Sequence, residues 1–330
     1  MAAEPTPKVS VVIPTYGKSE LLAATLASLD GQTYPAGLTE VVVADDCSPD
    51  ETQEVLRGLK PAYRLVGRRH DVNRGRAAAR NTAIRAATGD LVLFLDDDMR
   101  ADPKLVEEHV RFQTEHHGAV VIGNALTAPE LGTSVVFAYM DTRGVHKLAT
   151  GERSPARYFN TNDTSVPRQA LLDAGLFDEA FLSYGFEDMD IGYRLEERAG
   201  LSFWYCASAI AYHIHHHTLE QFLSKRLEAA RSTLPLLLEK HPGRARDLSV
   251  EVLLPRAASD SVGLRARKTV VQAVTAAPVE GAVSAVVARL RPGGFAFTLM
   301  EYLIACQYRR GLALGPVRPI ASGATRPARD

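Results

Sequence analysis

The sequence predicts an α/β protein with a doubly wound, mostly parallel sheet flanked by helices, followed by a helical C-terminal extension. Two observations support this prediction. Short apolar runs rich in valine and isoleucine alternate with stretches whose apolar residues recur every three or four positions, which is the rhythm of βαβ units with right-handed crossovers. After residue 218 the strand-like runs stop and long helical patterns take over.

The first hundred residues contain most of the strand signals. Val9–Ile13 is a β-branched run closed by Pro14, and the alanine- and arginine-rich stretch 76–87 consists of strong helix formers. Ser48 and Glu51 have the spacing of a capping box, with a proline in the first turn. In chain order we expect strands at 9–13, 39–44, 63–67 and 91–95, and helices at 18–29, from 48 onward and at 76–87.

The pattern becomes mixed after residue 100. Residues 129–160 interleave aromatic and charged residues without a regular period, so we expect loops that face a substrate. The long amphipathic stretch 219–239 contains Pro235, which we expect to bend the helix. We further expect helices at 103–116, 167–174 and 186–199, and strands at 119–123, 201–205 and 208–212.

Composition and charge narrow the class of protein. The chain has 330 residues, 46% of them apolar and 23% charged, which is ordinary for a globular protein with room for two domains or one domain and an appendage. A formal net charge of −1 argues against a strongly basic nucleic-acid-binding protein. Three isolated cysteines, with no CxxC pair, argue against a disulfide framework and a thiolate zinc site, and favour a reducing compartment.

The sequence also bears on location. Residues 1–10 lack a basic flank and a long apolar core, so we expect no signal peptide. The longest apolar runs fall short of the roughly 20 residues of a membrane-spanning helix. We therefore expect a cytoplasmic protein.

The acidic run Asp96–Asp97–Asp98 is the strongest chemical signal in the chain. It follows the predicted strand 91–95, and ligands bind at the carboxyl ends of strands in an open α/β sheet. Three neighbouring carboxylates repel one another, and a hard divalent cation such as Mg²⁺ or Mn²⁺ relieves that repulsion. The run therefore predicts a cation beside a phosphate-bearing substrate; the alternative is an acidic loop or helix cap without an ion.

Four segments in order and spacing resemble glycosyltransferase family 2, the nucleotide-sugar transferases of GT-A fold. They are VVIPTY at 11–16, VADDCS at 43–48, NRG at 73–75 with ARN at 79–81, and FLDDD at 94–98. A fifth segment, Gly185–Leu195, resembles the glutamate-aspartate helix of that family and a segment of animal galactosyl- and N-acetylgalactosaminyltransferases. The resemblance covers about residues 8 to 220, and the tail after it has no such likeness.

The resemblance implies an inverting, metal-dependent transferase that moves a sugar from a UDP- or dTDP-sugar to a hydroxyl acceptor. The acceptor would be a glycan, a lipid-linked molecule or a small molecule, and no nucleic acid is expected as a partner. It implies a GT-A catalytic domain at 1–218, divided into a nucleotide-binding half at 8–100 and an acceptor half at 101–218, before the extension at 219–330. Two alternatives stay open: a retaining transferase of the same fold, and a nucleotide-sugar-binding protein with a degenerate site.

The same resemblance implies which residues bind the donor. Tyr16 would stack on the nucleobase, and the backbone at Pro14 and Thr15 would line the same pocket. Asp46 resembles the acid that accepts a hydrogen bond from the ring N–H of uracil, although an acid at this turn can instead cap the following helix. Arg80 would reach the diphosphate, because guanidinium groups suit phosphate oxygens.

The acidic run would divide its roles. Asp98 would bind the metal directly, and Asp96 would take the ribose hydroxyls or a metal-bound water. Asp97 departs from the small or neutral residue that the family has between the two acids, and could itself be the ribose contact. His213 matches a histidine that completes the metal shell in family members, with His215 as the second choice.

The fifth segment would supply the general base. An inverting transfer needs a carboxylate that takes the proton of the attacking hydroxyl, and a metal that stabilises the leaving diphosphate. We assign the base to Asp188 and the binding of donor or acceptor hydroxyls to Glu187. The alternative for either acid is capping of the helix that follows.

The tail differs in charge from the rest of the chain. From residue 243 to residue 330 there are 13 Lys or Arg against 6 Asp or Glu, a net charge of +7. We expect a helical appendage packed on the catalytic domain, because paired apolar helix faces usually form a core. The alternative is a basic amphipathic surface for an anionic acceptor or for peripheral contact with the inner face of a membrane.

Overall fold

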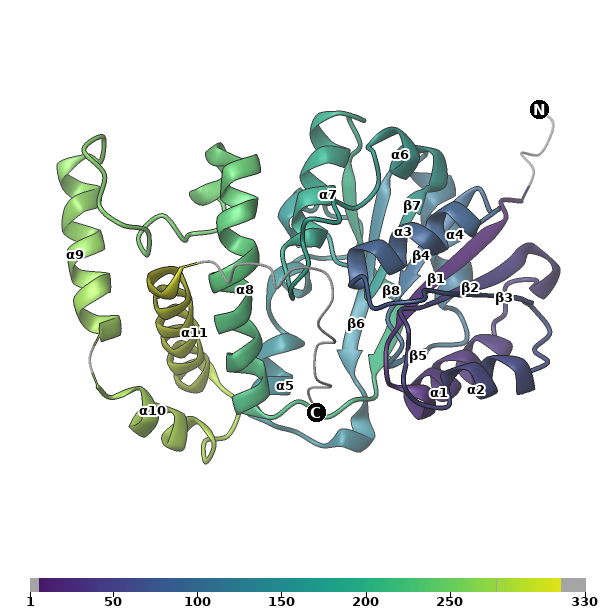
Figure 1. Ribbon diagram of the computed structural model, residues 1–330, viewed down its shortest axis with the longest axis horizontal. Helices are drawn as coiled ribbons and strands as arrows, with labels where there is room; N and C mark the ends of the chain where they lie inside the picture. The colour runs from purple at the N-terminus through teal and green to yellow at the C-terminus, as the bar shows by residue number, and fades with distance from the viewer. Residues whose placement is uncertain (1–5, 277, 316–330) are drawn as a thin grey trace.

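The structure is a computed structural model that describes residues 6–276 and 278–315, and within them one eight-stranded sheet occupies the half of the molecule away from the C-terminal helices (Figure 1). The strand order is β3-β2-β1-β4-β7-β6-β8-β5. The strands are β1 (Val9–Thr15), β2 (Thr39–Asp45), β3 (Arg64–Arg69), β4 (Leu91–Leu95), β5 (Met99–Ala101), β6 (Val120–Thr127), β7 (Asp163–Pro167) and β8 (Phe203–His213).

The sheet is mixed. Strands β3, β2, β1 and β4 run parallel to one another, as do β6 and β8, whereas β7 runs antiparallel between β4 and β6, and β5 is antiparallel to β8. The predicted α/β class with flanking helices is confirmed. Strands β5 and β7 were not predicted, because β5 has only three residues and β7 reads Asp-Thr-Ser-Val-Pro, without the apolar run of a buried strand.

Helices cover both faces of the sheet. The helices are α1 (Ser19–Asp30), α2 (Thr52–Gly58), α3 (Arg76–Ala86), α4 (Leu105–Glu115), α5 (Val135–Met140), α6 (Arg168–Asp173), α7 (Glu187–Glu197), α8 (Leu219–Lys240), α9 (Val262–Ala276), α10 (Glu280–Val287) and α11 (Gly294–Leu314). Apolar residues of α3 and α7 pack on one face, with Val12 and Phe94 in the same core. Apolar residues of α1 and α4 pack on the other face.

The strand register brings the acidic segments to one edge of the sheet. Thr15 pairs with Asp45 at the ends of β1 and β2, and Val12 pairs with Phe94, so the residues after β4 lie level with the end of β1. Met99 pairs with His213 at the end of β8. Segments far apart in sequence therefore meet at this edge.

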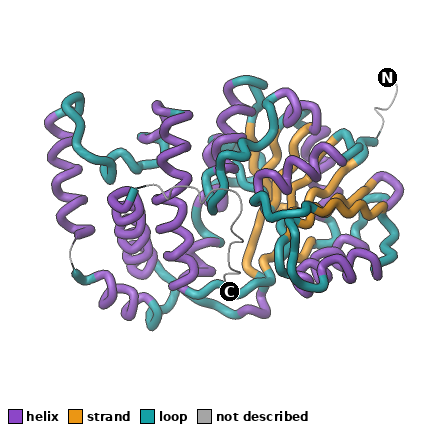
Figure 2. Tube along the Cα trace, viewed as in Figure 1, coloured by secondary structure: helices purple, strands orange, loops and turns teal. Residues whose placement is uncertain are grey.

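The C-terminal extension is helical, and the strands all lie in the other half of the molecule (Figure 2). Apolar residues of α8, α10 and α11 form a third core together with Val135 and Val136 of α5. Helix α11 packs closely on α8: a Cβ built on Gly311 would lie 2.7 Å from the Cβ of Ala230. Helix α8 continues through Pro235 to Lys240. Residues 316–330 of the predicted extension lie outside the described residues.

Two local expectations were wrong. The helix expected from Ser48 begins only at Thr52, and Ser48 Oγ instead accepts a hydrogen bond from the backbone of Gly17 at 3.0 Å. The stretch 129–160, expected to be irregular, contains helix α5, which Ser134 caps by accepting from Phe137 N. The bond between Gly17 and Ser48 joins positions 31 residues apart, which local spacing does not show, whereas the Ser134 cap is a local bond three residues long.

Candidate functional site

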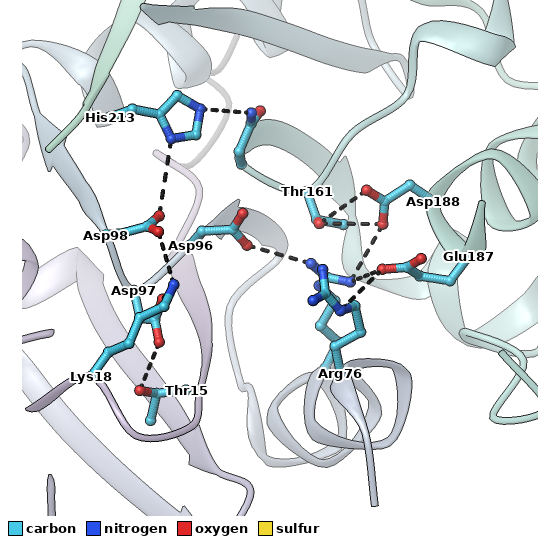
Figure 3. Close-up of polar contacts among 12 residues, drawn as sticks. Thr15, Lys18, Arg76, Asp96, Asp97, Asp98, Thr161, Glu187, Asp188 and His213 are labelled. Carbon is cyan, nitrogen blue, oxygen red and sulfur yellow. Dashed lines mark hydrogen bonds and ion pairs between the residues drawn. The ribbon is translucent and has the colours of Figure 1, made fainter. Parts of the chain in front are cut away.

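The three aspartates after β4 point in different directions (Figure 3). Asp97 is buried and accepts hydrogen bonds from Thr15 Oγ1 at 2.8 Å and from Lys18 Nζ at 3.0 Å. Asp98 accepts from the same ammonium group at 2.8 Å. Asp96 turns the other way, toward the guanidinium of Arg80 at 3.4 Å. A lysine therefore neutralises two of the carboxylates, and an arginine contacts the third.

The charge states of the two buried aspartates differ. Burial raises the pKa of Asp97 to about 6; Lys18 opposes this shift and Asp98 adds to it. Burial also disfavours the ionised form of Asp98, but Lys18 and His213 outweigh it and lower the pKa of Asp98 to about 2. Asp98 is thus ionised across the physiological pH range, as a cation ligand must be.

His213 reaches Asp98 because β5 and β8 pair at this point. Their antiparallel register sets Met99 opposite His213, and Ile214 N donates to the carbonyl of Asp98 at 3.0 Å. His213 Nδ1 lies 4.0 Å from Asp98 Oδ1, and this buried nitrogen has no hydrogen-bond partner within the described residues. Asn162 contacts the other ring nitrogen at 3.2 Å and so helps to hold the ring.

Asp98 and His213 fit a divalent cation. A carboxylate oxygen and an unpartnered imidazole nitrogen lie close together, and Mg²⁺ or Mn²⁺ needs only one or two protein ligands when phosphates supply the others. Within residues 6–276 and 278–315, no group of three or more His, Cys, Asp or Glu side chains gathers as a complete cation site. His215, the second choice, contacts His217 edge to face with ring centroids 5.0 Å apart. Cation binding by Asp98, His213 and His215 stays a prediction.

Asp46 organises the loop that leads into α3. Its carboxylate accepts from the backbone N–H groups of Arg74 at 2.8 Å and Gly75 at 2.7 Å, and it lies 2.7 Å from His70 Nδ1. Gly75 has a φ of 88°, a backbone conformation that favours glycine. The neighbouring Asp45 has a turn role, since it accepts a hydrogen bond from Ser48 N at 2.7 Å.

The structure places the predicted nucleobase residues next to this loop. The backbone N–H of Asp46 donates to the carbonyl of Thr15 at 2.9 Å, so the ends of β1 and β2 are joined here. Pro14 is the last residue but one of β1, and the ring of Tyr16, which follows the strand, is 37% exposed. An exposed aromatic ring beside a fixed carboxylate suits stacking on a base, and that role stays a prediction.

Arg80 is surrounded by carboxylates, and its side chain is only 3% exposed. Its Nη1 atom donates to Glu187 Oε1 at 2.9 Å and lies 3.4 Å from Asp188 Oδ1. Its Nη2 atom contacts Asp96. The guanidinium that the resemblance assigned to the diphosphate thus holds together the acids of two segments, after β4 and at the start of α7, and a diphosphate contact stays a prediction.

Glu187 and Asp188 open α7 after a turn with unusual backbone geometry. Gly185 has a φ of 89° and Phe186 a φ of 68°, and the left-handed region is costly for an aromatic residue. Phe186 is the N-cap residue and neither acid makes a capping hydrogen bond, but both lie in the first turn of α7, where the helix dipole favours negative charge. Glu187 Oε2 is buried without a hydrogen-bond partner in the described part of the chain, and Asp188 accepts from Thr161 Oγ1 at 3.2 Å.

The environment of Asp188 suits proton transfer. Burial raises the pKa of Asp188 to about 7; Arg80 opposes the shift, and the negative charges of Glu187 and Asp96 add to it. A carboxylate with a pKa near 7 can accept a proton at neutral pH and release it afterwards. The site thus contains an acid, Asp188, that can exchange a proton near neutral pH, and a pair of groups, Asp98 and His213, that fit a cation.

Comparison with known proteins identifies the family. Residues 10–173 match the family model described as Glycosyl transferase family 2. The chain belongs to glycosyltransferase family 2. It is 29% identical over 293 residues to the uncharacterized glycosyltransferase YfnE of Bacillus subtilis, a match that covers 74% of this chain and 73% of YfnE.

A second relative of this glycosyltransferase is the chondroitin synthase of Escherichia coli, with 30% identity over 237 residues. That match covers 62% of this chain and 34% of the synthase, so the chain spans only about a third of that protein. Family membership therefore defines the catalytic class, and the relatives' substrates are not transferred with it.

Two solved structures confirm the GT-A fold of this glycosyltransferase. The mannosyltransferase PcManGT from Pyrobaculum calidifontis, in complex with GDP-Man and Mn²⁺, superposes with a TM-score of 0.62 at 22% identity, covering 93% of this chain and 88% of that one. S. aureus TarS 1-349, in complex with UDP, superposes with a TM-score of 0.53 at 21% identity, covering 93% and 90% of the two chains. At these identities the likeness concerns the fold.

Sequence reasoning missed four residues of the glycosyltransferase site. They are Lys18 on Asp97 and Asp98, His70 on Asp46, Thr161 on Asp188, and Asn162 on His213. Only Lys18 carried a signal. It is the N-cap residue of α1, where the helix dipole disfavours a positive charge. A lysine at such a position indicates that carboxylates lie nearby and compensate for this unfavourable interaction. The other three lie in segments without a distinctive pattern.

Proposed function

We propose that this glycosyltransferase is metal-dependent and inverting, and that it moves a sugar from a UDP- or dTDP-sugar to a hydroxyl acceptor in a single displacement. The observation that carries the proposal is the position of Asp188. This acid, with its raised pKa, lies across from the Asp98 and His213 pair, and Asp96 lies between them (Figure 3). A donor bound between the two groups would present its anomeric carbon to an acceptor activated by Asp188.

Each residue then has a defined task. Asp188 takes the proton of the acceptor hydroxyl as its oxygen attacks the anomeric carbon and the bond to the diphosphate oxygen breaks. Glu187 Oε2, buried and unpartnered among the described residues, accepts a sugar hydroxyl. Arg80 holds both acids in place. A divalent cation held by Asp98 and His213 would neutralise the departing diphosphate, and the Mn²⁺ in the PcManGT complex supports such an ion.

The base of the nucleotide would be read by Asp46 and Tyr16. A fixed carboxylate favours a base with a ring N–H donor, which uracil and thymine carry. The UDP complex of TarS supports a uridine donor, whereas GDP-Man in the PcManGT complex shows a guanosine donor on a similar fold. Guanine also carries a ring N–H, so a nucleotide screen should include GDP beside UDP and dTDP.

The decisive test is donor binding in the presence and absence of Mn²⁺. We expect UDP with Mn²⁺ to raise the melting temperature, because a ligand at 100 times its Kd adds about 2.7 kcal/mol to the stability of the folded state. EDTA and the substitution Asp98→Ala should each remove this increase. Asp173→Ala, which removes an exposed carboxylate of α6, serves as the matched control and should keep it. An unchanged increase in Asp98→Ala would contradict the metal assignment.

Product analysis tests the stereochemistry. Inversion follows from direct attack on the anomeric carbon opposite the leaving group, and retention would require a second displacement or an internal return. The anomeric coupling constant of the product, measured by NMR, distinguishes the two. A product with the configuration of the donor would replace the inverting assignment by the retaining alternative.

We further propose a cytoplasmic enzyme in peripheral contact with the inner face of a membrane through α9 and α10. No single helix of residues 6–276 and 278–315 is long and apolar enough to cross a bilayer, but these two helices, bent by 74°, reach that length and apolar content together. Val270 and Val274 are 62% and 52% exposed. Four exposed arginines accompany them on α9 and after α10: Arg265, Arg267, Arg289 and Arg291.

Vesicle sedimentation tests this contact. Amphipathic helices with basic residues bind anionic lipid through apolar burial and charge. We expect binding to vesicles that contain phosphatidylglycerol, weaker binding to pure phosphatidylcholine, and loss of most binding in Val270→Asp with Val274→Asp. Equal absence of binding to both vesicles would contradict the proposal and favour the packed appendage expected first.

A further inference from the structure

Helix α8 of the extension packs directly on the turn that leads into the catalytic acids. A Cβ built on Gly185 would lie 3.2 Å from the Cβ of Ala229, so a side chain here would force a neighbour to shift, and the φ of 89° also favours glycine. Thr233 Oγ1 donates to the carbonyl of Tyr184 at 3.0 Å. The extension therefore fixes Tyr184 and the turn that follows it, and its side chains on this face are placed next to the site.

Two cations meet at the ring of Tyr184. The guanidinium carbon of Arg76 lies 4.9 Å from the ring centroid, and Lys225 Nζ of α8 lies 5.5 Å from the same centroid. Arg76 also reaches Glu187, with 3.7 Å between Nε and Oε1. An aromatic ring attracts both cations, but it does not neutralise their charge. Lys225 thus lies at the edge of the site: it contacts the ring of Tyr184, the same ring contacts Arg76, and Arg76 contacts Glu187.

Lys225 lacks an anionic partner of its own. Of the carboxylates in the described residues, none lies within 4.0 Å of its ammonium group. Burial lowers the pKa of Lys225, and the positive charges of Lys18 and Arg76 lower it further, while Asp98 opposes them. Arg226 adds to the lowering. A half-buried lysine among like charges is unfavourable until an anion enters the space that these groups share.

We propose that Lys225 binds the phosphate oxygens of the donor diphosphate and stabilises the negative charge that forms as the diphosphate leaves. The inference rests on the proposed transfer reaction. When the bond from the anomeric carbon breaks, the diphosphate oxygen keeps the electron pair, and an ammonium group beside it stabilises that charge. The donor is favoured over an anionic acceptor because the helix of Lys225 begins at Leu219, shortly after His213 at the end of β8, and because the charges of Lys18 and Asp98 act on Lys225. The extension would then take part in catalysis directly.

The test compares UDP with UMP, which differ by one phosphate, using calorimetry on the full chain in the presence of Mn²⁺. Lys225→Met keeps the length and packing of the side chain and removes the charge. We expect it to weaken UDP binding about tenfold and to leave UMP binding unchanged, since one charge-assisted contact is lost. Lys225→Arg should restore most of the UDP affinity. Lys104→Met, at an exposed lysine before α4, is the matched control and should bind UDP like the wild type.

The outcomes separate this inference from the reaction it rests on. If the wild type binds neither UDP, dTDP nor GDP, the proposed reaction fails. If the wild type binds UDP and Lys225→Met binds UDP equally well, only the role of Lys225 is overturned. A raised KM for the acceptor with unchanged UDP affinity would likewise overturn it, because the charge would then serve the acceptor. Equal weakening of UDP and UMP would show a structural role and also overturn it.

Discussion

Asp188→Asn is expected to reduce kcat by roughly 10²-fold or more while donor binding stays intact, because general-base catalysis contributes on that scale. The amide has nearly the shape of the carboxylate and can keep the contact with Thr161, but it cannot take a proton. The loss should therefore be in turnover, and the Kd of UDP with Mn²⁺ should match that of the wild type. Single-turnover kinetics and calorimetry measure the two quantities.

The pH dependence of the wild type provides a second measurement on the same residue. Because the pKa of Asp188 is raised to about 7, kcat should fall as the pH drops below about 7 and level off above it. The sign for stability is the opposite. A raised pKa means that the folded state binds more protons than the unfolded state between about pH 4 and pH 7, so ionisation of Asp188 reduces stability as the pH rises. Asp188→Asn should accordingly melt no lower than the wild type at pH 8.

The control for this substitution lies on the same helix. Glu197→Gln, at an exposed position near the end of α7, removes a carboxylate far from the site and should keep wild-type turnover. Normal turnover of Asp188→Asn would show that another group is the base, and Glu187→Gln would be the next variant to measure. A loss of turnover that comes with a loss of UDP binding would assign Asp188 to the donor instead.

Arg80→Met is expected to destabilise the folded protein by about 3–5 kcal/mol, the scale for removing one partner of a buried ion pair. Glu187, whose side chain is 2% exposed, would lose its nearer ion-pair partner and keep only the 3.7 Å contact with Arg76, and Asp188 and Asp96 would lose the positive charge between them. Since Arg80 lowers the pKa of Asp188, its removal should also protonate the base near neutral pH and reduce kcat. Denaturant unfolding at pH 8 measures the first effect.

The pH dependence and a double substitution show whether repulsion among the acids is the cause. Without Arg80 the carboxylates should bind protons more readily in the fold, so the deficit at pH 8 should shrink at pH 5. Glu187→Gln added to Arg80→Met should recover part of the stability. The exposed Arg85→Met on the same helix should change stability by less than about 0.5 kcal/mol. A variant Arg80→Met as stable as the wild type would remove the structural role assigned to this arginine.

The parts of the fold that follow from local pattern were predictable. The strand before Asp96 is an uninterrupted apolar run, and its strand–helix neighbours have clear periods, so the edge of the sheet and its acids could be inferred from the sequence. Strand β7 could not, because Asp163 and its polar neighbours are buried by hydrogen bonds with α4, such as the 2.7 Å contact with His109. Tertiary partners of this kind override the local signal.

The sequence allowed us to predict which acidic residues lie together in the site. It did not allow us to predict which residue each of them contacts. The direction of Asp97 depends on a lysine from α1, and the engagement of Arg80 depends on acids more than 100 positions away. Spacing along a chain predicts which side chains share a strand end or a helix face, but it does not predict which residue of opposite charge pairs with each of them. The position of Lys225 was likewise outside such reasoning, because it follows from the docking of α8 on Gly185.

The tight fit of α8 limits how enzymes built like this one can diversify. Gly185 and Ala229 approach so closely that a larger residue at either position would push the helix away from the catalytic turn, and Gly311 imposes a similar restriction behind it. A tail exchanged from another lineage would need small residues at positions 229 and 311 before the hybrid could turn over substrate. New acceptor preferences would thus arise more readily by point changes in the exposed loops than by recombination of whole modules.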